Sequence, residues 1–187
     1  MKSNNNTEFV RASAVYRLGG IIAYPAEAVW GLAGNPMNIN AIHKVQIIKN
    51  RVDDKKLIIV ASDLYYFRNF VSMAYLLENH EMLSGWPGPT TWVVPASKST
   101  PRHLVARDGT IAIRFTNDPS VKQLCLFCNG ALFSTSANLS GDKPIRDYKQ
   151  FMLQFSGAVD CVISGEVGGL ANPTPIRLVS NGEYIRT

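Results

Sequence analysis

Four cations lie close together in the chain and could bind phosphate. Lys49, Arg51, Lys55 and Lys56 fall between the end of an expected helix and an expected buried strand. Cations at that position also complement the partial negative charge of a helix C-terminus. Spacing alone therefore favours a solvated helix end over a phosphate site. No Gly-x-x-x-x-Gly-Lys-Ser/Thr or Gly-x-Gly-x-x-Gly motif occurs, so an ATP site would have to be built differently.

A run of small polar residues directly follows an expected strand: Ser134-Thr135-Ser136-Ala137-Asn138-Leu139-Ser140-Gly141. Hydroxyl, amide and backbone donors without bulk suit an oxygen-rich ligand at close range. A Ser/Asn turn before a helix cap would have the same composition, so the loop alone leaves both interpretations open. The loop and the basic cluster together favour an anion site.

Two further loops could line a pocket. Glu27 follows a short apolar run that ends at Pro25, and its carboxylate could accept local hydrogen bonds or contact a substrate ammonium group. The segment 86–91, Trp-Pro-Gly-Pro-Thr-Thr, is stiffened by its two prolines and could be a rigid connector or a pocket wall.

The cysteines and histidines do not predict a metal site. Cys125 and Cys128 have Cys-x-x-Cys spacing, but they share an expected helical face with Val121 and Leu124, which is typical of core positions. Cys161 falls in an expected buried strand, and the three histidines lack ligand or Ser/Asp spacing. We assign these residues no catalytic or metal-binding role.

The elements that must position these residues alternate between short apolar runs and helical periodicity. Caps mark three helix ends: Gly19-Gly20 after the first helix, Asn38 before the second, and Asp118-Pro119 before a later one. Asn181-Gly182 favours a hairpin turn. Helices are expected at 8–18, 38–50, 64–70, 72–83, from 119, and at 148–155, and strands at 21–24, 57–61, 91–94, 111–115, 131–134, 159–163, 176–179 and 183–185. The pattern predicts one α/β domain over 1–187, with a mixed parallel and antiparallel sheet flanked by helices.

Composition limits the functional classes. The 187 residues are 46% hydrophobic, enough to bury a core, and the formal net charge is +5, which suits an anionic ligand such as a nucleotide or RNA. The sequence has no apolar run of the roughly 18 residues needed to cross a bilayer and no signal-peptide core, so we expect a cytoplasmic protein that does not enter membranes.

The segments, in their order, resemble the YrdC/TsaC family over essentially the whole chain. The matching stretches are Tyr24-Pro25-Ala26-Glu27-Ala28-Val29-Trp30-Gly31-Leu32, Lys49-Asn50-Arg51 with Lys55, Trp86-Pro87-Gly88-Pro89 with Thr91, Ala112-Ile113-Arg114, the Ser134–Gly141 loop, and Asn172-Pro173-Thr174. The resemblance implies a twisted mixed sheet around a concave basic site. It also implies synthesis of L-threonylcarbamoyladenylate from L-threonine, bicarbonate and ATP, with Mg²⁺, for the modification of tRNA adenosine beside the anticodon by partner proteins.

The resemblance also assigns roles to single residues. Lys49, Arg51 and Lys55 are implied to act on the ATP phosphates as the catalytic cations. The other implied ATP contacts are Thr91, Ser136, Asn138 and Arg186, and the implied threonine site consists of Glu27, Arg114, Ser134 and Thr174. Arginine forks match carboxylate and phosphate oxygens, which agrees with these assignments.

The chain departs from the family pattern at three places. Ala26 stands where the motif commonly has a threonine, which removes one polar contact to the amino acid. Val52 replaces a frequent proline, and 175–177 (Pro-Ile-Arg) differs from the Ser/Thr-rich version of longer relatives. We interpret the last two as loop variation.

Two functional alternatives follow from the same charge. A basic concave face could bind double-stranded RNA or tRNA directly, as a ribosome-maturation or tRNA-binding module without catalysis. A related enzyme could handle another carbamoyl donor. The Ser136/Asn138 loop separates the first alternative from a synthase, because a plain RNA-binding module would not require it.

Overall fold

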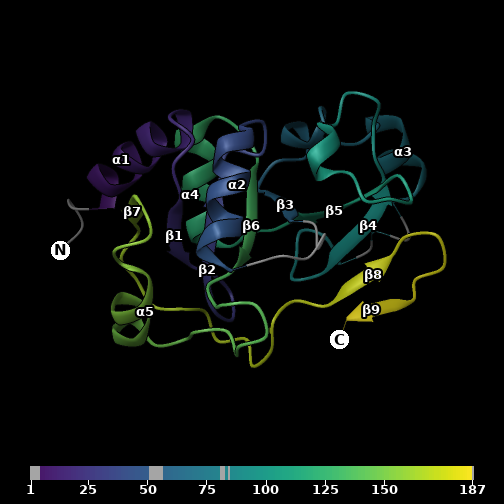
Figure 1. The fold of residues 1–187 in the computed structure, drawn as a ribbon. Helices are drawn as coiled ribbons and strands as arrows, with labels where there is room; N and C mark the ends of the chain where they lie inside the picture. The colour runs from purple at the N-terminus through teal and green to yellow at the C-terminus, as the bar shows by residue number, and fades with distance from the viewer. Residues whose placement is uncertain (1–4, 51–56, 81–82, 84, 187) are drawn as a thin grey trace.

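The computed structural model describes residues 5–50, 57–80, 83 and 85–186. In this part of the chain nine strands form one mixed sheet (Figure 1). In spatial order they are β7 (Cys161–Val162), β1 (Ile22–Pro25), β2 (Trp30–Gly34), β6 (Leu132–Ser136), β3 (Ile58–Ala61), β5 (Thr110–Phe115), β4 (Thr91–Pro95), β8 (Ile176–Leu178) and β9 (Tyr184–Arg186). Three strand pairs, β1–β7, β3–β5 and β4–β8, are parallel, and the rest are antiparallel. The predicted mixed sheet is confirmed.

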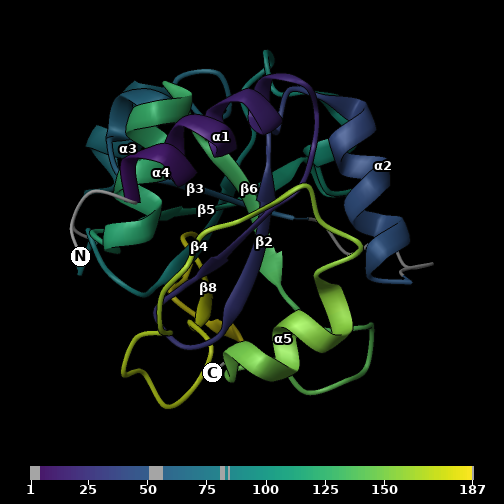
Figure 2. The ribbon, with the colours of Figure 1, turned by 90° about the vertical axis from the view of Figure 1, so that its left-hand side faces the viewer.

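Helices lie on both sides of this sheet. Figure 2 shows α1 (Asn5–Arg17) and α4 (Pro119–Cys128) on one side and α5 (Tyr148–Phe155) on the other. The remaining helices are α2 (Ile39–Ile48), α3 (Met73–Glu78) and two 3₁₀ turns, η1 (Leu64–Phe67) and η2 (Arg102–Leu104). No helix of the described residues is both long and apolar enough to cross a membrane.

The three predicted caps lie at helix ends in the structure. Asn38 accepts hydrogen bonds from Asn40 N and Ala41 N at the start of α2, and Asp118 accepts one from Val121 N at the start of α4. Gly19 follows α1 with a φ of 76°, a conformation that suits glycine. Leu18, expected on the apolar face of the first helix, is instead 85% exposed, because α1 ends at Arg17.

The strand β2 was not predicted from the sequence. Its two glycines weaken the strand signal, since glycine has low strand propensity. The structure shows why Gly31 belongs there: a Cβ at this position would lie 2.8 Å from the ring of Tyr24 on the neighbouring strand. The turn that brings β2 back beside β1 is closed by the hydrogen bond from Ala26 N to Val29 O.

The helices predicted at 64–70 and 72–83 are both shorter in the structure. Asp63 caps only the 3₁₀ turn η1, and α3 spans Met73–Glu78 with Ser72 as its N-cap. The apolar residues Phe67, Phe70 and Val71 are buried, and the last two lie outside any helix. Tertiary burial, rather than helical periodicity, therefore explains the apolar pattern there.

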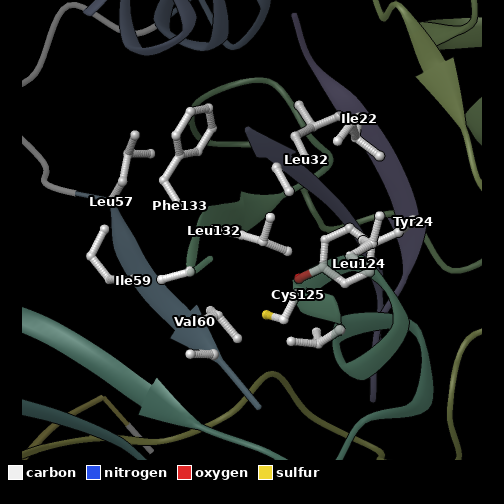
Figure 3. Close-up of a cluster of buried hydrophobic side chains, with 14 of the residues drawn as sticks. Ile22, Tyr24, Leu32, Leu57, Ile59, Val60, Leu124, Cys125, Leu132 and Phe133 are labelled. Carbon is white, nitrogen blue, oxygen red and sulfur yellow. The ribbon is translucent and has the colours of Figure 1, made fainter. Parts of the chain in front are cut away.

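Side chains alternate between the two faces of the sheet along the three central strands β3, β5 and β6, and one of these faces packs into the core. Ile59, Ile113 and Phe133 pair across β3, β5 and β6 and are fully buried, and Figure 3 shows Ile59 and Phe133 in the buried cluster with Leu124 and Cys125 of α4. The core interpretation of Cys125 and Cys161 is confirmed, since both are buried. The residues between these strand positions face the opposite way, toward the site described next.

Candidate active site

A cavity of about 590 Å³ lies over the second face of the sheet. Alternate strand residues form its floor, among them Ile58, Ala112 and Ser134, which pair with one another across β3, β5 and β6. Eight of the residues predicted for the site line this one cavity: Glu27, Lys49, Arg114, Ser134, Ser136, Asn138, Thr174 and Arg186. Segments distant in sequence are thus brought together around one cavity.

Of the other three predicted residues, only Thr91 is described. Arg51 and Lys55 lie outside the described residues, as do Lys56 and Val52. Thr91 is fully buried at the start of β4 and does not line the cavity. The ATP contacts assigned to Arg51, Lys55 and Thr91 therefore remain predictions.

Lys49 is buried, so the interpretation of this residue as part of a solvated helix end is wrong. Its side chain is only 1% exposed, and Nζ donates to Ser136 O at 2.6 Å, Asn138 O at 2.8 Å and Asn138 Oδ1 at 3.2 Å. Its own carbonyl accepts from Ser140 N at 3.0 Å. Lys49, the described member of the basic cluster, therefore contacts the Ser/Asn loop directly.

Asn138 stabilises the same loop through hydrogen bonds of its own side chain. Its Oδ1 accepts from Ser136 Oγ at 2.6 Å, while its Nδ2 donates to Leu139 O at 2.7 Å and Asp142 O at 2.9 Å. Because these bonds fix both ends of the amide, Asn138 shapes the loop as well as lining the cavity. The loop is thus held in place by its own side chains, as a structural Ser/Asn turn would be, and the same residues line the cavity.

Glu27 also lines the cavity and acts as a local hydrogen-bond acceptor. Its Oε1 accepts from Thr116 Oγ1 at 2.7 Å, and its Oε2 lies 3.4 Å from Arg114 Nη2. The local acceptor role, one of the two interpretations left open by the sequence, is seen in the structure, and contact to a substrate ammonium group stays a prediction. Both side chains of the ion pair are largely buried, so each charge depends on the other for compensation.

Arg114 still has hydrogen-bonding capacity for a ligand. Its Nη1 donates to Thr174 Oγ1 at 3.1 Å, whereas its buried Nε has no hydrogen-bond partner among the described residues. A buried donor without a partner is costly, so the Nε favours any arrangement of the site that gives it an acceptor. Arg186 donates to Thr174 O at 2.7 Å, and burial together with the charge of Arg114 lowers its pKa. Two neighbouring guanidinium groups favour an anion at this end of the cavity.

Two features of the cavity were missed in the sequence. Tyr24 lines it, and its hydroxyl is hydrogen-bonded to Ser134 Oγ at 2.8 Å, with burial raising the pKa of the phenol. The apolar part of the lining includes Ile58, Val60, Val93, Ile176, Leu178 and Ile185. Alternation in the expected strands could have indicated these positions, but not that they share one cavity.

The stiff segment 86–91 is a connector rather than a cavity wall. Trp86 packs against Phe67 and Phe115 with ring centroids 6.2 and 6.1 Å apart, and its Nε1 donates to Thr90 O. None of the residues 86–91 lines the cavity. Ala26, where the sequence departs from the family motif, does line it.

The Asp118 carboxyl next to this site has a pKa raised to about 6, chiefly by burial, and the nearby charge of Glu27 adds to the shift. The native state therefore binds this proton more tightly than the unfolded chain does. The stability gained from that tighter binding is present below about pH 4 and is lost as pH rises to about 6. We expect Asp118→Asn, whose Oδ1 can still cap α4, to raise the free energy of unfolding by about 1 to 2 kcal/mol at pH 8 and to change it little at pH 4. Thermal unfolding at both pH values tests this, and a variant less stable than wild type at pH 8 would contradict it.

The chain is similar to known proteins over most of its length. The model of the Sua5/YciO/YrdC family, described as "Telomere recombination", matches residues 14–187. A threonylcarbamoyl-AMP synthase of Halorhodospira halophila is 38% identical over 175 residues, covering 94% of this chain and 92% of the relative. The enzyme of the same name from Coxiella burnetii is 40% identical over 170 residues, covering 91% of each chain.

Solved structures show the same fold. P. abyssi Sua5 complexed with L-threonine superposes with a TM-score of 0.84 at 26% identity, covering 94% of this chain and 52% of that one. The chain therefore spans about half the length of that protein. E. coli YciO superposes with a TM-score of 0.78 at 22% identity, covering 96% of this chain and 90% of that one.

Proposed function

Because the chain belongs to the Sua5/YciO/YrdC family, we propose that it makes L-threonylcarbamoyladenylate and pyrophosphate from L-threonine, bicarbonate and ATP. The observation that carries this proposal is the cavity itself. It joins a loop rich in small polar groups, organised by Lys49, to a cationic end at Arg114 and Arg186. An adenylate-forming enzyme needs a nucleotide and an amino acid side by side, and the cavity offers both environments.

The reaction consists of two steps. The amine of threonine attacks carbon dioxide derived from bicarbonate and loses a proton, which forms a carbamate. A carbamate oxygen then attacks the α-phosphorus of ATP, the bond between the α-phosphorus and its bridging oxygen to the β-phosphate breaks, and pyrophosphate leaves. No side chain becomes covalently attached, so the protein accelerates the reaction by alignment and charge stabilisation.

We assign the described residues of the cavity to two groups, one for each substrate. Arg114 would bind the threonine carboxylate beside Thr174, and Ser134 would line the same end. The Ser136–Asn138 loop and Arg186 would hold the nucleotide, with Lys49 positioning the loop. Arg51 and Lys55 remain the proposed phosphate contacts.

Mg²⁺ belongs to the proposal as part of the Mg-ATP substrate. Mg²⁺ is usually bound through substrate phosphates and only one or two protein carboxylates. The described residues contain no group of three or more His, Cys, Asp or Glu side chains that could hold a metal ion. A cytoplasmic location, and partner proteins that transfer the product to tRNA adenosine, are further parts of the same proposal.

The test is a pyrophosphate-release assay. Purified protein, L-threonine, bicarbonate and Mg-ATP should yield pyrophosphate and, by mass spectrometry, the threonylcarbamoyl adenylate. Omitting threonine or bicarbonate should stop both signals. Ala26 removes one polar contact to the amino acid, so selectivity for threonine should be tested as well. Serine and valine should be added as competitors of threonine in the same assay. Absence of a threonine-dependent product would contradict the proposed function and would favour an RNA-binding role.

A further inference from the structure

An irregular segment, residues 164–174, packs against the loop that carries Ala26 and Glu27. This segment, here the strap, connects β7 to β8. Its backbone donates two hydrogen bonds to the Ala26–Glu27 loop, from Gly168 N to Ala26 O at 2.8 Å and from Leu170 N to Glu27 O at 3.1 Å. Because Ala26 and Glu27 line the cavity, the position of the strap is transmitted to the cavity wall.

Gly168 allows an unusually close approach of the two segments. A Cβ on Gly168 would lie 2.5 Å from the carbonyl oxygen of Glu27 and 2.9 Å from its Cα. Both atoms belong to the backbone, so a side chain there requires the strap to move outward. The next residue differs, because a Cβ on Gly169 would meet nothing within 4 Å.

Arg146 holds the same part of the strap through its side chain. Its guanidinium donates to Ala171 O at 2.7 Å and to Leu170 O at 2.8 Å, a fork that matches two successive carbonyls. Arg146 directly follows Ile145, which donates its N–H to Ala137 O at 3.3 Å and accepts from Trp30 N at 2.8 Å. The arginine therefore links the strap to the Ser134–Gly141 loop.

The strap ends in the cavity. Pro173 and Thr174 line it, and Thr174 accepts from both Arg114 and Arg186. The strap thus contacts the Glu27 loop at its centre and the two cations at its end. Its placement sets the spacing between Glu27, Arg114 and Thr174.

We propose that Gly168 and Arg146 are positioning residues for the amino-acid half of the site. They hold the strap against the Ala26–Glu27 backbone and so keep Thr174 in register with Arg114. This inference rests on the proposed function for the identity of its ligand, threonine. Neither residue lines the cavity, so both act through the strap.

Two matched pairs of variants test the proposal. Gly168→Ala should raise the KM for threonine about tenfold, equivalent to losing about one good hydrogen bond. It should leave the KM for ATP within about twofold. Gly169→Ala, with open space at its Cβ, should behave as wild type. Arg146→Ala should raise the KM for threonine in the same way, and Arg146→Lys should restore part of the loss, because an ammonium group can reach one carbonyl.

Calorimetric titration of each variant with threonine, alone and with a non-hydrolysable ATP analogue, supplies a readout besides turnover. Weaker threonine binding in Gly168→Ala and Arg146→Ala, with unchanged nucleotide binding, supports the positioning role even if the wild type releases no pyrophosphate. Unchanged threonine binding in both variants, or an equal loss for threonine and nucleotide, overturns it. A wild type that does not bind threonine overturns both this inference and the proposed function. If Gly168→Ala does not fold, the Arg146 pair decides.

Discussion

Arg114→Leu is expected to lower kcat/KM for threonine by at least about 100-fold. The substitution removes the Nη1 donor to Thr174 and leaves the Glu27 carboxylate without its cation. Truncating one partner of a buried, hydrogen-bonded charge pair costs about 2 to 5 kcal/mol, and every 1.4 kcal/mol is a factor of about ten. Initial rates of pyrophosphate release over a range of threonine concentrations measure the effect.

Two control variants separate charge from geometry at this position. Arg114→Lys keeps the positive charge beside Glu27 but loses the planar fork, so it should fold stably while still using threonine poorly. Arg102→Leu removes an exposed arginine of η2, outside the cavity, and should stay within about twofold of wild type. If Arg114→Leu retained wild-type kinetics, Arg114 could not be the carboxylate-binding residue.

Lys49→Met is the second large effect, and it should be visible in both stability and nucleotide binding. Methionine can fill the apolar part of the space but leaves Ser136 O, Asn138 O and Asn138 Oδ1 without the Nζ donor. Ser136 O keeps its hydrogen bond from Asn138 N, and Asn138 Oδ1 keeps the one from Ser136 Oγ, so Asn138 O is the acceptor most affected among the described residues. An unsatisfied buried acceptor costs about 1 to 3 kcal/mol, and we expect a loss of that size in unfolding free energy. The loop would no longer be held, and affinity for ATP should fall at least about tenfold.

Chemical denaturation and nucleotide titration at a temperature where the variant is folded measure the two effects. Lys122→Met provides the matched control, because Lys122 is an exposed lysine of α4 and should leave both quantities nearly unchanged. If Lys49→Met lowered ATP affinity with no loss of stability, the lysine would be a direct phosphate ligand rather than a support of the loop. Wild-type stability and affinity would refute both roles.

Most elements of the fold could be predicted because local signals and tertiary packing agree. Asn38 and Asp118 cap α2 and α4 as expected, and the apolar runs 21–24 and 57–61 become the buried strands β1 and β3. The exceptions have local causes. Glycine-rich β2 has a weak strand signal, and buried apolar residues beyond η1 are packed without forming a helix. Pattern reasoning assigns burial more reliably than backbone conformation in such segments.

Residue types at the site are evident in the amino-acid order alone: cations near position 49, a small polar loop after an apolar strand, Arg114, and Thr174. The order of the motifs, which resembles that of a known family, predicted that these residues share one function. How they act depends on the folded chain, because their hydrogen-bond partners come from segments far apart in sequence. Nothing in the spacing shows that Lys49 is buried against the Ser136–Asn138 loop, or that Arg114 is paired with Glu27. The strap is the clearest case, since the close approach of Gly168 to the Glu27 backbone joins opposite ends of the chain.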